Sequence, residues 1–218
     1  MSKKKIQICC DSSCDLGAEL CERYSIVLNP FRINLGDESF IDGVEITPDE
    51  LYAYHDRTGN LPKTSATNMA EHLEFFEQQL ETAEEVIFFT ISAQMSANNQ
   101  AAKLAAEELE HVYIIDSANL STGVCLLLIK AAELAEAGAT AEEICQKIEE
   151  IKNTVNASFV IDSLEYLHKG GRCSSIAALG ANLLKLKPCI EVKNGGMGVA
   201  KKYRGRFEDV LITYTKER

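Results

Sequence analysis

Residues 86–91 form the stretch that most restricts how this chain can fold. Val-Ile-Phe-Phe-Thr-Ile is a continuous run of apolar, aromatic and β-branched residues that is too short for a helix. Such a run is typical of a strand buried on both faces, as strands of parallel sheets are. Ser92 and Ser96 follow in a turn, and the Ala-rich segment 97–109 favours a helix. A buried strand that leads directly into a helix predicts an α/β fold.

Further apolar segments alternate with helical patterns through the first 156 residues. Thr47 and Thr140 are each followed three residues later by glutamate, which is the sequence signature of a capping box. The predicted strands are 5–10, 25–34, 86–91 and 112–115, the predicted helices are 16–22, 47–57, 69–81, 121–137 and 140–153, and a loop is predicted at 61–68. This alternation predicts a Rossmann-like layer domain with a parallel sheet over residues 1–156.

The composition changes after residue 156, and a second, smaller α/β domain is predicted for residues 157–218. Asn194-Gly195-Gly196 is a hairpin signal between two apolar segments. The predicted strands are 158–161, 187–192 and 198–203, and the predicted helices are 163–169, 174–184 and 207–215. The chain is therefore expected to be a two-domain α/β protein.

Composition and charge exclude several classes of protein. The formal net charge is -11, which argues against a nucleic acid partner because such proteins need a basic surface. No apolar run approaches the length of a membrane span, and the basic start MSKKK is not followed by a signal-peptide core. The eight cysteines are scattered without zinc-ligand spacing. We expect a cytoplasmic protein with no metal, no cofactor and no stable insertion into a membrane.

Hydroxyl side chains precede two of the predicted helices. Thr64 and Ser65 stand before the helix at 69–81, and Ser92 and Ser96 stand before the helix that follows residue 97. Helix N-termini with nearby hydroxyls favour anions, so a shared anion site is one interpretation. The other is that Ser96 is only an N-cap and binds nothing.

An enzyme that uses the same anion site, such as a small-molecule phosphotransferase or hydrolase, is an alternative function. The sequence contains no Walker loop and no Gly-x-Ser-x-Gly elbow. Asp11 and Asp116 follow predicted strands and could bind a metal, although a role in turns explains them equally well. Gly170-Gly171-Arg172 is also explained as a helix C-cap with a surface arginine.

Several motifs together resemble the DegV family, in the family's order and across nearly the whole chain. The Leu-Glu-Tyr-Leu block that begins at Leu164 and ends in Gly170-Gly171-Arg172 is the most specific of them. The resembling segments are residues 11–16, 61–65, 91–96, 115–117, 164–172 and 187–188.

The resemblance implies a protein that performs no chemistry itself. It implies a long-chain fatty acid held in an apolar tunnel between two domains, with its carboxylate presented to a separate fatty acid kinase. That kinase makes the acyl-phosphate used in phospholipid synthesis. The residues that the resemblance assigns to the carboxylate are Thr64, Ser65, Ser92 and Ser96. It places Arg172 and Arg204 near the head group or on the kinase-facing surface.

The chain departs from the family pattern in three places. Ala66-Thr67 stands where the family commonly has Gln-Pro, and Ala97-Asn98 stands where it commonly has Gly-Thr. The chain also ends at Arg218, before a C-terminal part that members usually carry, which includes a histidine near the head group. The resemblance therefore implies either a truncated product or a member with a shortened second domain.

Overall fold

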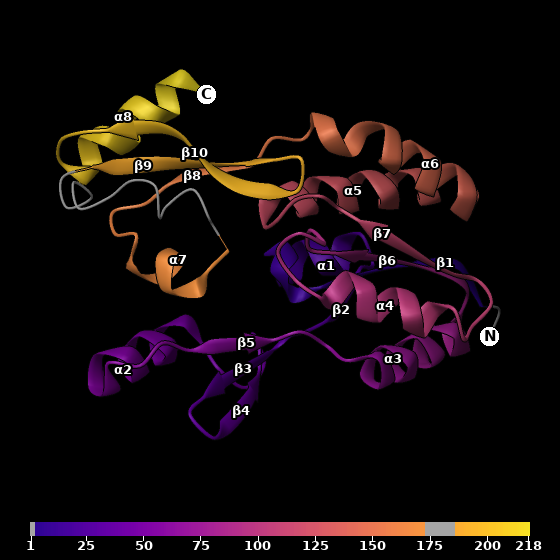
Figure 1. The fold of residues 1–218 in the computed structure, drawn as a ribbon. Coiled ribbons are helices and arrows are strands. Elements are labelled where there is room, and N and C mark those ends of the chain that lie inside the picture. Colours follow the sequence, from indigo (N-terminus) through magenta and orange to yellow (C-terminus); the bar gives the residue numbers. More distant parts are fainter. Residues whose placement is uncertain (1–2, 173–185) are drawn as a thin grey trace.

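A four-stranded parallel sheet forms the centre of the computed structural model, which describes residues 3–172 and 186–218 (Figure 1). Its strand order is β2-β1-β6-β7. The strands are β1 (Lys4–Asp11), β2 (Val27–Asn29), β6 (Ala83–Thr90) and β7 (Val112–Asp116). The predicted α/β class and parallel sheet are confirmed. The helix predicted at 174–184 and Cys173 lie outside the described residues.

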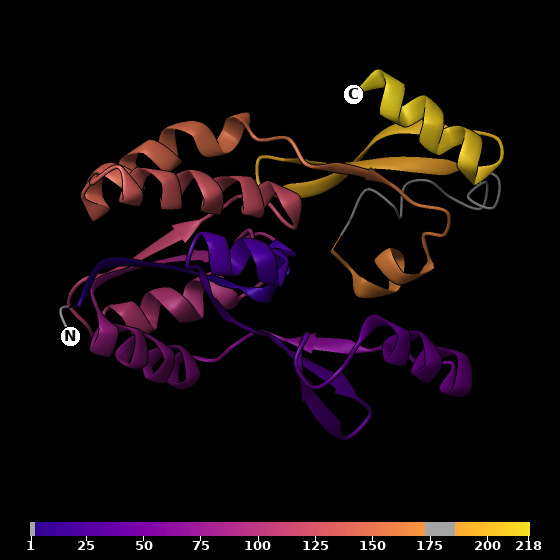
Figure 2. The same cartoon turned by 180° about the vertical axis from the view of Figure 1, so that it is seen from behind.

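Helices cover both faces of this sheet, as both views of the ribbon show (Figures 1 and 2). One face packs against α1 (Ala18–Arg23), α5 (Thr122–Glu136) and α6 (Ala141–Ile151), and the other against α3 (Met69–Thr82) and α4 (Asn98–Ala106). Successive residues of β6 alternate between these layers, because side chains of a strand point to opposite faces. Ile87 and Phe89 pack toward α5, whereas Phe88 packs against Phe76 of α3. The predicted burial of this strand on both faces is confirmed.

An inserted unit separates β2 from α3. It consists of a small antiparallel sheet of order β4-β3-β5 and one helix. Its elements are β3 (Arg32–Leu35), β4 (Glu38–Ile41), α2 (Pro48–Thr58) and β5 (Lys63–Ser65). The prediction of one strand over 25–34 was wrong, because the segment divides at Pro30, which has no N–H for a ladder. The predicted loop 61–68 likewise contains β5, which pairs with β3.

A third sheet, also antiparallel, has the order β10-β9-β8. Its strands are β8 (Ser158–Val160), β9 (Lys187–Lys193) and β10 (Gly196–Tyr203). Val210 of α8 (Phe207–Glu217) packs on one face, and Leu167 of α7 (Glu165–Gly170) packs with Ile190 on the other. The boundary predicted near residue 156 falls between the 3-10 turn η2 (Lys152–Thr154) and β8. None of the helices in the described ranges is long and apolar enough to cross a membrane.

Capping boxes fix where three of the helices begin. The predicted boxes at Thr47 and Thr140 are confirmed, with the Thr140 N–H donating to Glu143 Oε2 at 2.9 Å. Asn68 and Glu71 form a third box, which the sequence also encodes but which was not predicted. Because Asn68 caps α3, the hydroxyls of Thr64 and Ser65 are not needed for that purpose and belong to β5 instead.

Candidate functional site

A cavity of about 1530 Å³ opens at the carboxyl ends of the parallel strands. It is bounded by the turns after β1 and β6, by the inserted unit, by α7, and by Met197 of β10. Ligands of open α/β sheets usually bind at this edge. The volume exceeds the roughly 300–1,000 Å³ of ordinary small-molecule sites, so a large ligand fits.

Four of the six predicted site residues line this cavity: Thr64, Ser65, Ser96 and Arg172. Ser65 is half-buried and its hydroxyl accepts a hydrogen bond from Asn34 Nδ2 at 2.6 Å. Thr64, its neighbour in β5, is exposed. These hydroxyls come from an element far from Ser96 in sequence, yet the fold brings all of them to one space.

Ser96 lines the cavity, and it precedes Ala97, which is the N-cap of α4, so the prediction that Ser96 itself is the N-cap was wrong by one residue. The Ser96 hydroxyl accepts a hydrogen bond from the Asn98 N–H at 3.2 Å, at the first residue of α4. Arg172 follows Gly171, which ends α7 in the left-handed conformation at φ 72°. Gly171 is thus the C-cap that the sequence allowed, and Arg172 reaches the cavity from just beyond it.

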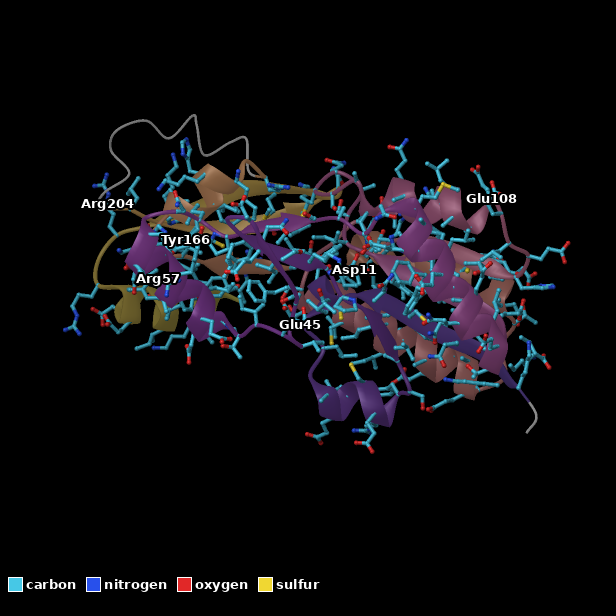
Figure 3. All side chains as sticks on the ribbon, turned by 90° about the horizontal axis from the view of Figure 1, so that it is seen from below. Asp11, Glu45, Arg57, Glu108, Tyr166 and Arg204 are labelled. Atoms are coloured by element: carbon cyan, nitrogen blue, oxygen red, sulfur yellow. The ribbon has the colours of Figure 1, made fainter. Side chains whose placement is uncertain are left out.

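Ser92 and Arg204 do not belong to the described lining. Ser92 is fully buried, and its hydroxyl donates to the Gly195 carbonyl at 2.6 Å. Arg204 is exposed after the end of β10 and lies at the far edge of the molecule in Figure 3. Ser92 therefore connects the turn after β6 to the β9–β10 hairpin.

A second hydrogen bond and an apolar cluster strengthen this connection between the turn and the hairpin. Gln94 Nε2 donates to the Asn194 carbonyl at 2.6 Å. Met95 packs with Val192 and Met197, which belong to the hairpin strands. The sequence indicated the hairpin turn, but nothing in it indicated which distant residues the turn would contact.

Apolar side chains form the remaining walls of the cavity. They are Phe31, Leu61, Pro62, Ile91, Met95, Leu120, Leu167 and Met197. The rings of His55 in α2 and Tyr166 in α7 meet edge to face, with centroids 5.1 Å apart. Figure 3 shows Tyr166 beside α2, so this contact joins two elements that bound the cavity.

Comparison with known proteins identifies the family. The profile described as "Uncharacterised protein, DegV family" matches residues 5–210. The chain belongs to the DegV family. A DegV domain-containing protein of Clostridium perfringens is 39% identical over 203 residues, which cover 92% of this chain and 73% of that protein.

Solved DegV structures share the fold. A structure described as showing fatty acid binding of a DegV family protein from Thermus thermophilus superposes with a TM-score of 0.86 at 30% identity, covering 97% of this chain and 77% of that chain. A stearic acid-binding protein from Eubacterium ventriosum has a TM-score of 0.82 at 28% identity, covering 97% of this chain and 77% of that chain.

The DegV-like segments that were separate in sequence converge on the cavity. Residues of the segments 11–16, 61–65, 91–96 and 164–172 all line it. Lining residues that the sequence analysis did not assign include Ser12, Ser13, Lys63 and Lys169. Each of these residues lies within one of the DegV-like segments, so the ranges of those segments could have predicted that they line the cavity. Ser12 is already engaged, since its hydroxyl donates to Asp42 Oδ2 at 2.7 Å.

The two aspartates that end strands in the DegV motifs have the turn-forming role considered from the sequence. Asp116 Oδ1 accepts from the backbone N–H groups of Ala93 and Ala118 at 3.1 and 2.9 Å. Asp11 is fully buried, and burial raises the pKa of its carboxyl, while hydrogen bonds from Ser13 and Ile91 oppose the shift. Within the described residues no group of three or more His, Cys, Asp or Glu is placed to hold a metal ion.

His72 beneath the site provides a prediction on pH. Burial lowers the pKa of this fully buried imidazole below its ordinary value of 6.5, and a hydrogen bond to Asn98 opposes the shift. Because the unfolded chain binds the proton more readily, neutral His72 stabilises the fold above pH 6.5, and this contribution is lost as pH falls through 6.5 toward the folded pKa. We expect the free energy of unfolding to fall between pH 7.5 and 5.5 more steeply in the wild type than in His72→Gln.

Urea denaturation at several pH values measures this difference. Phe75→Leu, a change on the same helix that adds no titrating group, serves as the control and should keep the wild-type slope. Parallel pH profiles for the wild type and His72→Gln would contradict the assignment.

Proposed function

We propose that this chain binds one long-chain fatty acid in the cavity and presents its carboxylate to a separate fatty acid kinase. The observation that carries the proposal is the convergence of Thr64, Ser65, Ser96 and Arg172 on one large cavity that also has apolar walls. A polar end and an apolar wall in the same space match an amphiphile with a small anionic head. The solved relatives described as fatty acid-binding proteins support this ligand class.

The proposed head-group site uses hydroxyls, a helix N-terminus and one arginine. The hydroxyls of Thr64 and Ser96 would donate charge-assisted hydrogen bonds to a carboxylate, and the dipole at the N-terminus of α4 would favour its negative charge. Arg172 adds a positive charge at the same cavity. The overall charge of -11 opposes an anionic ligand, but Lys and Arg outnumber Asp and Glu in residues 157–218, which supply part of this site.

Ser92 and Arg204 have different places in this proposal. The Ser92 hydroxyl stays on the Gly195 carbonyl and fixes the hairpin rather than the ligand. Arg204 lies on the outer surface, where it suits a contact with the kinase.

The acyl chain would supply most of the affinity. Burial of a hydrocarbon chain contributes about 0.8 kcal/mol for each CH₂ group, so a chain of palmitate length gains far more than the head group can. Ile91 and Met95 lie within or beside the proposed head-group turn, and Met197 belongs to the same apolar cluster as Met95. No catalytic step is assigned to the chain itself, and the acyl-phosphate is formed by the kinase.

The test is mass spectrometry of an organic extract from the purified, folded protein. We expect one long-chain fatty acid for each wild-type chain, and an occupancy reduced about tenfold in a Thr64→Ala/Ser96→Ala double variant that has lost two donors to a charged group. Ser39→Ala/Thr215→Ala removes one serine and one threonine hydroxyl from exposed positions outside the described lining and should keep full occupancy.

An empty wild-type protein that also fails to take up added palmitate would contradict the proposal. ATP hydrolysis by the chain alone would favour the phosphotransferase alternative. Acyl-phosphate formation that requires both this chain and the kinase would support the presentation role.

A further inference from the structure

A chain of hydrogen-bonded polar side chains runs beneath the cavity, from β2 to the end of β1. Asn29 Nδ2 lies 3.4 Å from His72 Nδ1, and His72 Nε2 lies 3.0 Å from Asn98 Oδ1. Asn98 Nδ2 then donates to Asp11 Oδ2 at 2.9 Å. His72, Asn98 and Asp11 are fully buried, so the two bonds that join them are shielded from solvent.

The Asp11 carboxylate determines which group donates and which accepts in each of these hydrogen bonds. The carboxylate of Asp11 only accepts, so Asn98 must turn its amide nitrogen toward Asp11 and its oxygen toward His72. That oxygen requires His72 to carry its proton on Nε2, and the bare Nδ1 can then accept from Asn29. Within the described residues no buried side-chain nitrogen or oxygen lacks a partner, so the arrangement has no unsatisfied group.

Asp11 joins three backbone segments that border the cavity. Oδ2 also accepts from the Ile91 N–H at 2.8 Å, at the start of the turn after β6. Oδ1 accepts from the Ser13 N–H at 3.2 Å and from the Ser13 hydroxyl. Through Asn98, Asp11 reaches the first residue of α4, whose N–H donates to Ser96 Oγ. Ser13, Ile91 and Ser96 all line the cavity, whereas Asp11 does not.

From these contacts we propose that Asp11, oriented by Asn98 and His72, is the positioning residue of the head-group site. This proposal rests on the proposed function and extends it. Asp11 would touch no ligand and would act by fixing the turns whose groups donate hydrogen bonds to the ligand. An isosteric amide at this position would present N–H groups to backbone N–H donors, and the turns would separate.

The alternative explanation is that the buried network only stabilises the fold. The two explanations differ in what they predict for a ligand without a carboxylate. A loss of the fold's stability affects the binding of any hydrophobic ligand equally, whereas displaced turns affect only a ligand whose head group they bind. Palmitate and 1-hexadecanol share the same chain length and differ in this head group.

The experiment measures the affinity of both ligands for Asp11→Asn in the full chain, below its unfolding transition. We expect palmitate to bind at least about tenfold more weakly than to the wild type, and hexadecanol to bind within about twofold. If Asp11→Asn does not fold, Asn98→Ala removes the bonds of this side chain to Asp11 and His72 but keeps the bonds of Asp11 to Ser13 and Ile91. It should reduce palmitate binding by about threefold to tenfold with the same selectivity.

Two further variants distinguish a positioning role of Asp11 from an effect on the stability of the fold. Ile148→Ala removes a fully buried side chain from α6, away from the site, and should destabilise the protein while both affinities stay unchanged. Asp11→Asn/Asn98→Asp reverses the donor and acceptor between the two residues and should recover part of the lost palmitate affinity.

Equal loss of palmitate and hexadecanol in Asp11→Asn, or no loss of either, would overturn the positioning role while the proposed function stands. A wild-type protein that binds neither ligand would overturn the proposed function and the positioning role together.

Discussion

Replacing Gly195 with alanine is expected to lower the free energy of unfolding by about 2–4 kcal/mol, which combines roughly 1–3 kcal/mol of backbone strain with the loss of about one hydrogen bond. Gly195 has a φ of 81°, which residues with a side chain rarely adopt. A Cβ atom there would come within 2.8 Å of Ser92 Oγ, the hydroxyl that donates to the Gly195 carbonyl. The hairpin would have to move away from the turn after β6. Urea denaturation measures the loss.

Gly198→Ala is the matched control for this prediction. Gly198 lies in the same hairpin, in β10, and a Cβ there would meet nothing within 4 Å. Its replacement should change the free energy of unfolding by no more than about 1 kcal/mol, as for glycine in an ordinary strand. If Gly195→Ala and Gly198→Ala were equally stable, the close contact between the hairpin and Ser92 would not exist in solution.

The fold was predictable where local patterns decide it. Residues 86–90 are buried on both faces because helix layers cover both sides of β6, and their continuous apolar pattern is visible in the sequence. The capping boxes at Thr47 and Thr140 are likewise local, because donor and acceptor are three residues apart. The division at Pro30 is also encoded locally by a residue without an N–H, although the sequence does not indicate that β2 and β3 join different sheets.

The site was predictable only as far as its motifs extend. The family resemblance indicated Thr64, Ser65, Ser96 and Arg172, and these line the cavity. It gave Ser92 the same role, yet the partner of that hydroxyl is a carbonyl 103 residues away, which no local pattern specifies. The network of Asp11 and His72 was missed for the same reason, since His72 is one of several polar residues on a helix and its burial follows from the packing of α3 against β6.

The second large effect is expected for a charge placed in the apolar wall. Met197 lines the cavity from β10 and packs with residues of two apolar clusters. In Met197→Glu, a carboxylate beside the acyl chain would lose hydration or take up a proton when the ligand binds, at a cost of roughly 2–4 kcal/mol. Palmitate affinity should therefore fall by about thirtyfold or more. A fluorescent fatty acid displaced by palmitate measures this affinity.

Met69→Glu provides the control, because it makes the same substitution at a partly exposed position outside the described cavity lining. Residue 69 is the first residue of α3, where a negative charge is favoured by the helix dipole, so the variant should fold and bind palmitate as the wild type does. The effect of Met197→Glu should also extend to hexadecanol, since the introduced charge opposes the hydrocarbon chain rather than the head group. A loss confined to palmitate would mean that the introduced charge acts on the carboxylate and not on the hydrocarbon chain, which would contradict the contact between Met197 and the acyl chain. Unchanged binding of both ligands would mean that the acyl chain does not contact this wall.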